Sequence, residues 1–148
     1  MAKRYRKAVF IVAYRKEKGN QILYLLLKRK LHWKGWEFPK GGLNSREINL
    51  NAVKREIKEE TGQRAEKIIK FKVKGKFKYA KKYSDRKGII GQNYNLFSAE
   101  LKSRKIKLDK LEHFAYKWLK YSHALKLLTW PNQKKSLRIV DRFLKTIK

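Results

Sequence analysis

The sequence contains no cysteine, only three histidines, and only 12 acidic residues against 41 lysines and arginines. Without cysteine the chain has neither disulfides nor thiolate metal sites, so we expect no disulfide-linked partner. Three histidines argue against a histidine-based metal site. Because acids are scarce, any cluster of carboxylates in this chain is the first place to look for chemistry.

Long apolar runs are also missing. No stretch approaches the roughly 18 apolar residues of a membrane-spanning helix, and the apolar segment at residues 8–13 is too short for a signal peptide. We therefore expect no membrane partner and a cytoplasmic location. The length of 148 residues fits a single domain over residues 1–148 with a sizeable core. The sequence assigns no oligomeric state.

Three carboxylates stand close together at Glu56, Glu59 and Glu60. In a helix, steps of three and four residues place all three on one stripe. Like charges this close raise one another's pKa unless a cation lies between them. Mg²⁺, which binds carboxylates together with substrate phosphates, suits such a stripe. The segment predicts a metal site for phosphate chemistry, with a solvated acidic helix face as the alternative.

The helix that carries this stripe is expected at residues 49–61. Asn49 or Asn51 can cap its start, and Gly62 stands where a left-handed residue ends a helix. Three apolar residues on the opposite face are expected in the core: Leu50, Val53 and Ile57. Residues 39–42 (Pro-Lys-Gly-Gly) precede the helix and can bring a backbone carbonyl close to a ligand.

Strand and helix patterns alternate along the rest of the chain. Period-two alternation predicts strands at residues 7–14, 21–29, 65–78, 89–101 and 113–119, with turns at 18–20 and 84–88. A short helix capped by Ser122 is expected to end near Leu128. A last helix follows Trp130-Pro131, with an apolar stripe at Leu137, Val140, Leu144 and Ile147. This order of elements indicates an α/β fold.

The pattern around the acidic stripe resembles the Nudix box of the Nudix hydrolases. The fixed positions of that motif are occupied by Gly41, Glu47, Arg55, Glu56, Ile57, Glu59, Glu60 and Gly62. The last motif position, usually apolar, is Gln63. The resemblance implies a Nudix-type α/β/α sandwich with a mixed β-sheet. It also implies hydrolysis of a nucleoside diphosphate linked to another group, with Mg²⁺ or Mn²⁺ required.

The same resemblance implies roles for individual residues. Glu56 and Glu60 would be the main metal ligands, with Glu59 assisting and the Gly41 carbonyl contributing. Glu47 would pair with Arg55 and hold the loop to the helix, which is a structural role.

Two further segments are similar to particular groups of this family. Residues 36–42 (WEFPKGG) resemble the segment leading into the box in diadenosine tetraphosphate hydrolases and bacterial RNA pyrophosphohydrolases. Residues 112–119 resemble a segment near the end of the asymmetrical diadenosine tetraphosphate hydrolases. In both groups a glutamate at the position of Glu112 reaches the metal site. Glu112 would then be a ligand or the base that orients the attacking water, with a loop glutamate of no catalytic duty as the alternative.

Substrate binding draws on cations and aromatic rings. Lys40 is a candidate for stabilising the departing phosphates, with an ordinary exposed lysine as the alternative. The resemblance points to Tyr79 and Trp130 as rings that stack on a nucleobase. Weaker candidates are Tyr83, Tyr94 and Trp33. The family often has glycine early in its first strand, near the base, whereas this chain has Val9-Phe10, so we expect a differently shaped pocket floor.

The formal net charge of +29 has two interpretations. One is a polyanionic partner such as RNA. The other is compositional drift toward lysine, which the even spread of charge along the sequence favours.

Three functions from different classes follow. The first is asymmetric hydrolysis of diadenosine tetraphosphate to ATP and AMP, which we favour. The second is RNA 5′-pyrophosphohydrolase activity, since Gly91-Gln92 and Tyr5-Arg6 resemble segments of the bacterial RNA enzymes. The third is a non-catalytic RNA-binding module, against which the intact carboxylate stripe argues.

Overall fold

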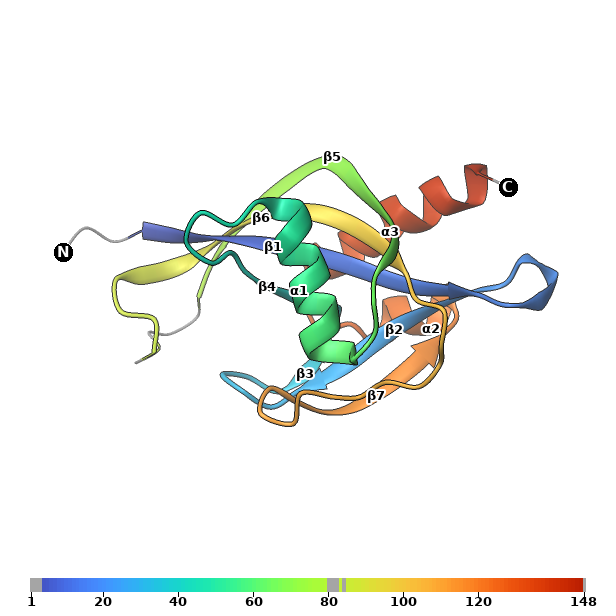
Figure 1. Cartoon of the computed structure of the whole chain (residues 1–148), viewed down its shortest axis with the longest axis horizontal. Coiled ribbons are helices and arrows are strands. Elements are labelled where there is room, and N and C mark those ends of the chain that lie inside the picture. Colours follow the sequence, from blue (N-terminus) through green and yellow to red (C-terminus); the bar gives the residue numbers. More distant parts are fainter. Residues whose placement is uncertain (1–3, 80–82, 84, 148) are drawn as a thin grey trace.

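A computed structural model describes residues 4–79, 83 and 85–147. Its strands are β1 (Arg4–Lys16), β2 (Ile22–Arg29), β3 (Gly35–Glu37), β4 (Lys40–Gly42), β5 (Glu66–Lys78), β6 (Ile89–Glu100) and β7 (His113–Leu119). Its helices are α1 (Asn49–Thr61), α2 (Tyr121–Leu127) and α3 (Pro131–Thr146), with a 3₁₀ turn at Lys18–Asn20 (Figure 1). The expected α/β class and the five predicted strands are confirmed, and the short strands β3 and β4 were missed.

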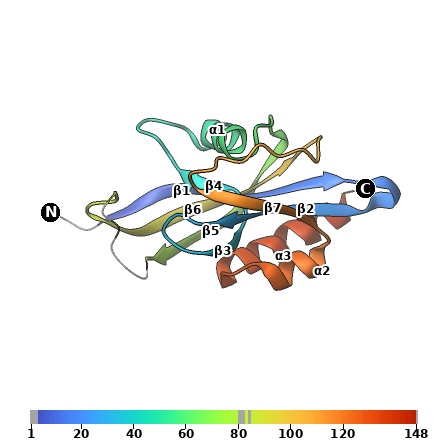
Figure 2. The ribbon, with the colours of Figure 1, turned by 90° about the horizontal axis from the view of Figure 1, so that it is seen from below.

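The sheet is mixed, as the resemblance implied. Its main path runs β3-β2-β1-β6-β5, while β4 pairs with β1 and β7 pairs with β2. The β1–β6 pair is parallel, and the other pairs are antiparallel. Helix α1 covers one face of the sheet, and α2 and α3 cover the other (Figure 2). The predicted α/β/α sandwich is therefore confirmed.

Strand β1 supplies both layers of the core, because successive side chains of a strand point to opposite faces. Val9 and Ile11 lie in the cluster with Val53 and Ile57 of α1. Even-numbered residues of β1, such as Phe10, belong to the cluster on the α3 face. Residues 8–14 of β1 are buried on both faces, which explains why this part of the strand is continuously apolar.

Several details at the helix ends differ from expectation. Neither Asn49 nor Asn51 caps α1; Ile48 is its N-cap residue and makes no side-chain cap bond. Helix α2 begins two residues earlier than expected, so Lys120 takes the N-cap position in place of Ser122. Leu50 is 42% exposed, because it faces away from the sheet.

At the other end of the chain, Ile147 is 41% exposed and follows the last turn of α3. Its place on the apolar stripe was therefore wrong. Gly62 ends α1 with φ of 77°, as predicted, and its N–H donates to the Lys58 carbonyl. Of the turn predicted at residues 84–88, Ser84 lies outside the described residues, and Gly88 has φ of 73°.

Gln63, the departure from the Nudix pattern, has a packing role of its own. Its side-chain amide donates to the carbonyls of Ser103 and Lys105, at 2.7 and 2.8 Å. Its side-chain oxygen accepts from the Ser103 N–H at 3.2 Å. A polar residue thus fastens the loop after β6 to the end of α1, where the family usually has an apolar contact.

Candidate functional site

Helix α1 brings two of its three clustered carboxylates into the protein. Glu56 and Glu60, four residues apart, are 8% and 1% exposed. Glu59 lies at the edge of the stripe, where its side chain is 53% exposed and contacts Arg55 at 3.3 Å. The alternative of a solvated acidic face is therefore wrong for Glu56 and Glu60.

Strand β4 meets these carboxylates through its backbone. The Lys40 N–H donates to Glu60 Oε2 at 3.1 Å. A Cβ atom added to Gly41 would lie 2.1 Å from the carboxyl carbon of Glu56. Only glycine permits so close an approach, and it leaves the Gly41 backbone directly beside the acidic stripe.

Arg55 ties the loop before α1 to the helix. It donates to both carboxylate oxygens of Glu47, at 2.9 and 2.8 Å, and to the Gly42 carbonyl at 2.9 Å. A further bond of 2.7 Å reaches Glu56 Oε1. The hydrogen bonds from Arg55 lower the pKa of Glu47 to about 2. One guanidinium therefore holds loop, strand and helix in a fixed arrangement.

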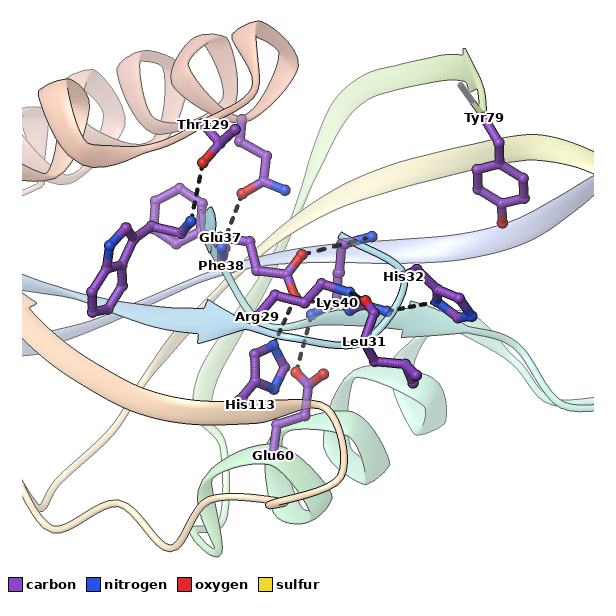
Figure 3. Close-up of polar contacts among 12 residues, drawn as sticks. Arg29, Leu31, His32, Glu37, Phe38, Lys40, Glu60, Tyr79, His113 and Thr129 are labelled. Carbon is purple, nitrogen blue, oxygen red and sulfur yellow. Dashed lines mark hydrogen bonds and ion pairs between the residues drawn. The ribbon is translucent and has the colours of Figure 1, made fainter. Parts of the chain in front are cut away.

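A buried ion network that sequence reasoning missed lies beside this stripe. Glu37 Oε2 accepts from Arg29 Nη1 at 2.9 Å and is 2.7 Å from His113 Nε2, and Glu37 Oε1 lies 3.8 Å from Lys40 Nζ. Figure 3 shows these side chains converging from β2, β3, β4 and β7. Burial alone would raise the pKa of Glu37, but Lys40, His113 and Arg29 together hold it at about 2.

The signal for this network was faint in the sequence. Glu37 is an acid inside an apolar segment, and His113 directly follows the candidate Glu112. What joins them is the register of the strands, since Arg29 pairs with His113 and Leu27 pairs with Glu37.

Glu112 reaches the acidic stripe from the start of β7. One ligand atom each from Glu60, Glu112 and His113 lie within 4.8 Å of one another. The Glu112 backbone is held by its carbonyl, which accepts from the Lys30 N–H at 2.9 Å. The structure therefore brings Glu112 to Glu60 and adds His113, which was not among the predicted ligands.

The chemistry of these residues fits a divalent cation. Burial raises the pKa of Glu60 well above its ordinary value, and Glu56 and Glu37 raise it further. Burial also raises the pKa of Glu56 to about 7. Glu60 Oε1 and His113 Nδ1 are buried without a hydrogen-bond partner among the described residues. Buried carboxylates that lack enough partners are costly, and a hard cation with oxygen ligands would offset that cost.

A cavity of about 630 Å³ opens next to the Glu37 network. Four of the substrate-binding candidates from the sequence line it, namely Lys40, Tyr79, Tyr83 and Trp130. Arg86, which the sequence did not single out, donates to the Tyr79 hydroxyl at 2.8 Å. The cavity thus combines aromatic rings with cations.

Of the two remaining aromatic candidates, one lines the cavity and the other does not. Trp33 lines the cavity and packs edge-on against Trp130, with ring centroids 5.2 Å apart. Tyr94 does not line it; its ring is buried and stacks on Phe10 at 3.8 Å. Phe10 lines the cavity wall, where the family often has glycine. Lys40 is no ordinary exposed lysine, because its side chain is only 10% exposed.

Two bonds join the tryptophan side of the cavity to β3. The Trp36 N–H donates to Thr129 Oγ1 at 3.0 Å, and the Phe38 N–H donates to Gln133 Oε1 at 2.9 Å. Thr129 and Gln133 lie on either side of Trp130 in the sequence, at the start of α3. These bonds fix the position of the Trp130 segment relative to the Glu37 network.

A buried carboxylate cluster beside a cavity of cations and aromatic rings is an arrangement suited to phosphoanhydride hydrolysis. Residues 4–140 match the NUDIX domain family, and the chain belongs to this family.

No helix among the described residues is long and apolar enough to cross a membrane.

Curated relatives and solved structures agree with this assignment. An RNA pyrophosphohydrolase of Baumannia cicadellinicola is 26% identical over 87% of this chain and 88% of its own length. One of Bartonella bacilliformis is 39% identical, but the match spans 45% of this chain and 41% of that protein. The Ap4A hydrolase of C. elegans, solved as a binary complex, is 26% identical with a TM-score of 0.76, covering 96% of this chain and 99% of that one.

Proposed function

We propose that the protein hydrolyses dinucleoside polyphosphates, with diadenosine tetraphosphate cleaved to ATP and AMP. The observation that carries this proposal is the position of Lys40. Its side chain lines the aromatic cavity and approaches Glu37, while its backbone N–H binds Glu60. A nucleotide whose base lies in the cavity would therefore direct its phosphates past Lys40 to the carboxylates.

Aromatic residues would bind the base, and the carboxylates would hold the metal. One base stacks on Trp130 or on Tyr79 and Tyr83, and each stacking contact stabilises binding by about 1–3 kcal/mol. Glu56, Glu60, Glu112 and the Gly41 carbonyl, with Glu59 at the rim, would hold Mg²⁺ or Mn²⁺. When bound, the cation lowers the pKa of a coordinated water and neutralises phosphate charge.

Hydrolysis forms one P–O bond and breaks another. The water oxygen forms a bond to phosphorus, and the phosphoanhydride P–O bond on the other side breaks. The departing phosphate takes the bonding electron pair, and Lys40 stabilises its charge. Glu112 accepts the proton of the water.

The experiment is a turnover assay with Mg²⁺ and diadenosine tetraphosphate, with products separated by chromatography. Equal amounts of ATP and AMP would support the proposal. Two ADP molecules, or no turnover by a folded protein, would contradict it.

RNA 5′-pyrophosphohydrolase activity is the second candidate. It is favoured by the curated relatives, which carry that name, and by Lys76 and Lys78 at the cavity. A short 5′-triphosphorylated RNA offered in the same assay distinguishes the two. The RNA would have to be turned over with the higher kcat/KM for this candidate to replace the first.

A further inference from the structure

A second cavity, of about 790 Å³, lies on the α1 face of the sheet. Its floor is set by strand register. Lys7 of β1 pairs with Asn93 of β6, which in turn pairs with Lys76 of β5. In the next row Asn95 pairs with Lys74. Paired residues, and residues two apart in a strand, share one face of a sheet, so three lysines and two asparagines form one patch.

The loop before α1 closes the other side of this cavity, and we call the whole cavity the α1 groove. Leu43, Ile48 and Asn49 line it. The Leu43 N–H donates to the Lys7 carbonyl at 3.0 Å, which holds the loop against β1. Ile48 is 61% exposed, and its side chain offers an apolar surface for the face of a base.

The charge of the α1 groove is positive. Lys7, Lys74 and Lys76 form no ion pair with another described residue. The acid in the lining, Glu47, has both oxygens bonded to Arg55. Helix α1 also begins here without a side-chain cap, so the N–H groups of its first turn add donors for an anion.

The α1 groove and the cavity of about 630 Å³, which we call the catalytic cavity, meet at one shared residue. Lys76 lines both, and β5 is the edge strand of the sheet, so a ligand can pass around it. Asn49 and Glu56 are seven residues apart on α1, which is about 10 Å along the helix axis. A chain whose first phosphate reaches Glu56 would place a later nucleotide in the α1 groove.

The same row of cations extends beyond the α1 groove. Exposed lysines alternate along β5 at Lys70, Lys72, Lys74, Lys76 and Lys78, while the residues between them face inward. Lys70 pairs with Phe97 and Lys76 pairs with Asn93, and these partners are four residues, or about 13 Å, apart on β6, because β5 has a register shift between Lys70 and Lys74. That length exceeds what one nucleotide can contact, and it favours a ligand with several phosphates in a line.

We propose that the α1 groove and the β5 lysines bind the phosphodiester backbone of single-stranded RNA. Lysines meet the phosphates, and the asparagine amides offer donors and acceptors to 2′-hydroxyl groups. The inference extends the second candidate function, in which the RNA end enters the catalytic cavity. Binding is therefore measured apart from turnover.

The test uses a 3′-labelled, 5′-hydroxyl single-stranded RNA of about 12 nucleotides, in EDTA, by fluorescence anisotropy over a range of KCl concentrations. The variant is Lys7→Gln with Lys74→Gln; Lys76 is left intact because it also lines the catalytic cavity. The control is Lys126→Gln with Lys135→Gln, which removes the same charge from exposed positions on α2 and α3, on the opposite face of the sheet.

Each lost phosphate contact on a single strand reduces the slope of log K against log salt by about 0.7. The α1 groove variant should therefore lose about 1.4 in slope, which corresponds to about 25-fold weaker binding at about 0.1 M salt. The control should keep nearly the wild-type slope. Turnover of diadenosine tetraphosphate should stay unchanged in both variants.

Three results would overturn the inference. The first is that the α1 groove variant binds RNA like the wild type. The second is that the control loses as much RNA affinity as the α1 groove variant, which would mean non-specific attraction. A raised KM for diadenosine tetraphosphate with unchanged RNA binding would assign the α1 groove to the distal nucleotide of that substrate. Absence of turnover on every polyphosphate, with the binding difference intact, would count against the proposed function alone.

Discussion

Replacing Glu37 by glutamine removes the carboxylate that three buried cationic or polar side chains share. The pKa of Glu37 is about 2, against an ordinary value of 4.5. At 1.36 kcal/mol for each pKa unit, the network stabilises the charged form by about 3 kcal/mol. The variant also leaves the Arg29 guanidinium, 4% exposed, without its counter-charge, and broken buried pairs cost about 3–5 kcal/mol. We expect a loss of about 3 kcal/mol in the free energy of unfolding.

The assay is urea unfolding of the metal-free protein at neutral pH. In thermal unfolding, a loss of about 3 kcal/mol in a domain of this size corresponds to a Tm lower by roughly 6–12 °C. The matched control is Glu66→Gln, whose half-buried carboxylate lies 3.9 Å from Lys102, and which should change stability by less than about 0.5 kcal/mol. A Glu37→Gln variant within about 1 kcal/mol of wild type would refute the view that this network holds β2, β3 and β7 together.

The stabilisation that ionised Glu37 contributes should depend on pH. Because the pKa of Glu37 is depressed in the folded protein, its stabilisation is present above the unfolded pKa and is lost as pH falls from about 4.5 toward 2. The difference between wild type and Glu37→Gln should therefore shrink in acid. If the difference in the free energy of unfolding between the two proteins stayed constant down to roughly pH 2.5, the charge of Glu37 would not contribute to stability.

Three more predictions concern the site itself. Glu60→Gln should abolish Mg²⁺-dependent turnover and reduce the rise of Tm on adding Mg²⁺, while the metal-free Tm does not fall; wild-type turnover would contradict the metal assignment. Trp130→Ala should raise the KM for diadenosine tetraphosphate about 5-fold or more with a smaller change in kcat, because a stacking contact of about 1–3 kcal/mol is lost; an unchanged KM would remove Trp130 from the base site. Since the pKa of Glu56 is raised to about 7, the metal-free protein should lose stability as pH rises from about 4.5 through 7. Added Mg²⁺ should then raise Tm more at about pH 7.5 than at about pH 5.5, and equal rises would count against this pKa.

Local patterns in the sequence predicted most of the fold. The bounds of α1 and of β7 agree with expectation, because strict periodicity and a terminal glycine act within the element itself. Strands β3 and β4 have three residues each, too few for alternation to be recognised. The predicted N-cap of α1 was wrong because contacts outside the helix determine where it begins. Asparagine favours the N-cap, but the start of α1 is fixed by Arg55, which binds the preceding loop through Glu47.

In the candidate site, too, local spacing identified some residues, while strand pairing determined the position of others. Glu56 and Glu60 could be found because a helix brings residues four apart together, whereas Glu37, Arg29 and His113 meet only through the pairing of β2 with β3 and β7. No short-range pattern encodes that pairing. The protonation of Glu37 likewise depends on charges contributed by three different strands, so its low pKa could not be inferred from sequence.

Folding gathers lysines that are spread evenly along the sequence onto one face of the sheet. Lysines spread evenly along the sequence suggested drift in composition. In β5, however, Phe71, Val73 and Phe77 pack against the core, which forces the alternate lysines onto the opposite face of an edge strand. Lys7 joins them because β1 runs parallel to β6 in the register that places it beside Asn93. Lysines that are evenly spaced in the sequence therefore form a row in the folded protein, and this row begins at the catalytic cavity. Measuring the salt dependence of RNA binding tests whether that line is used.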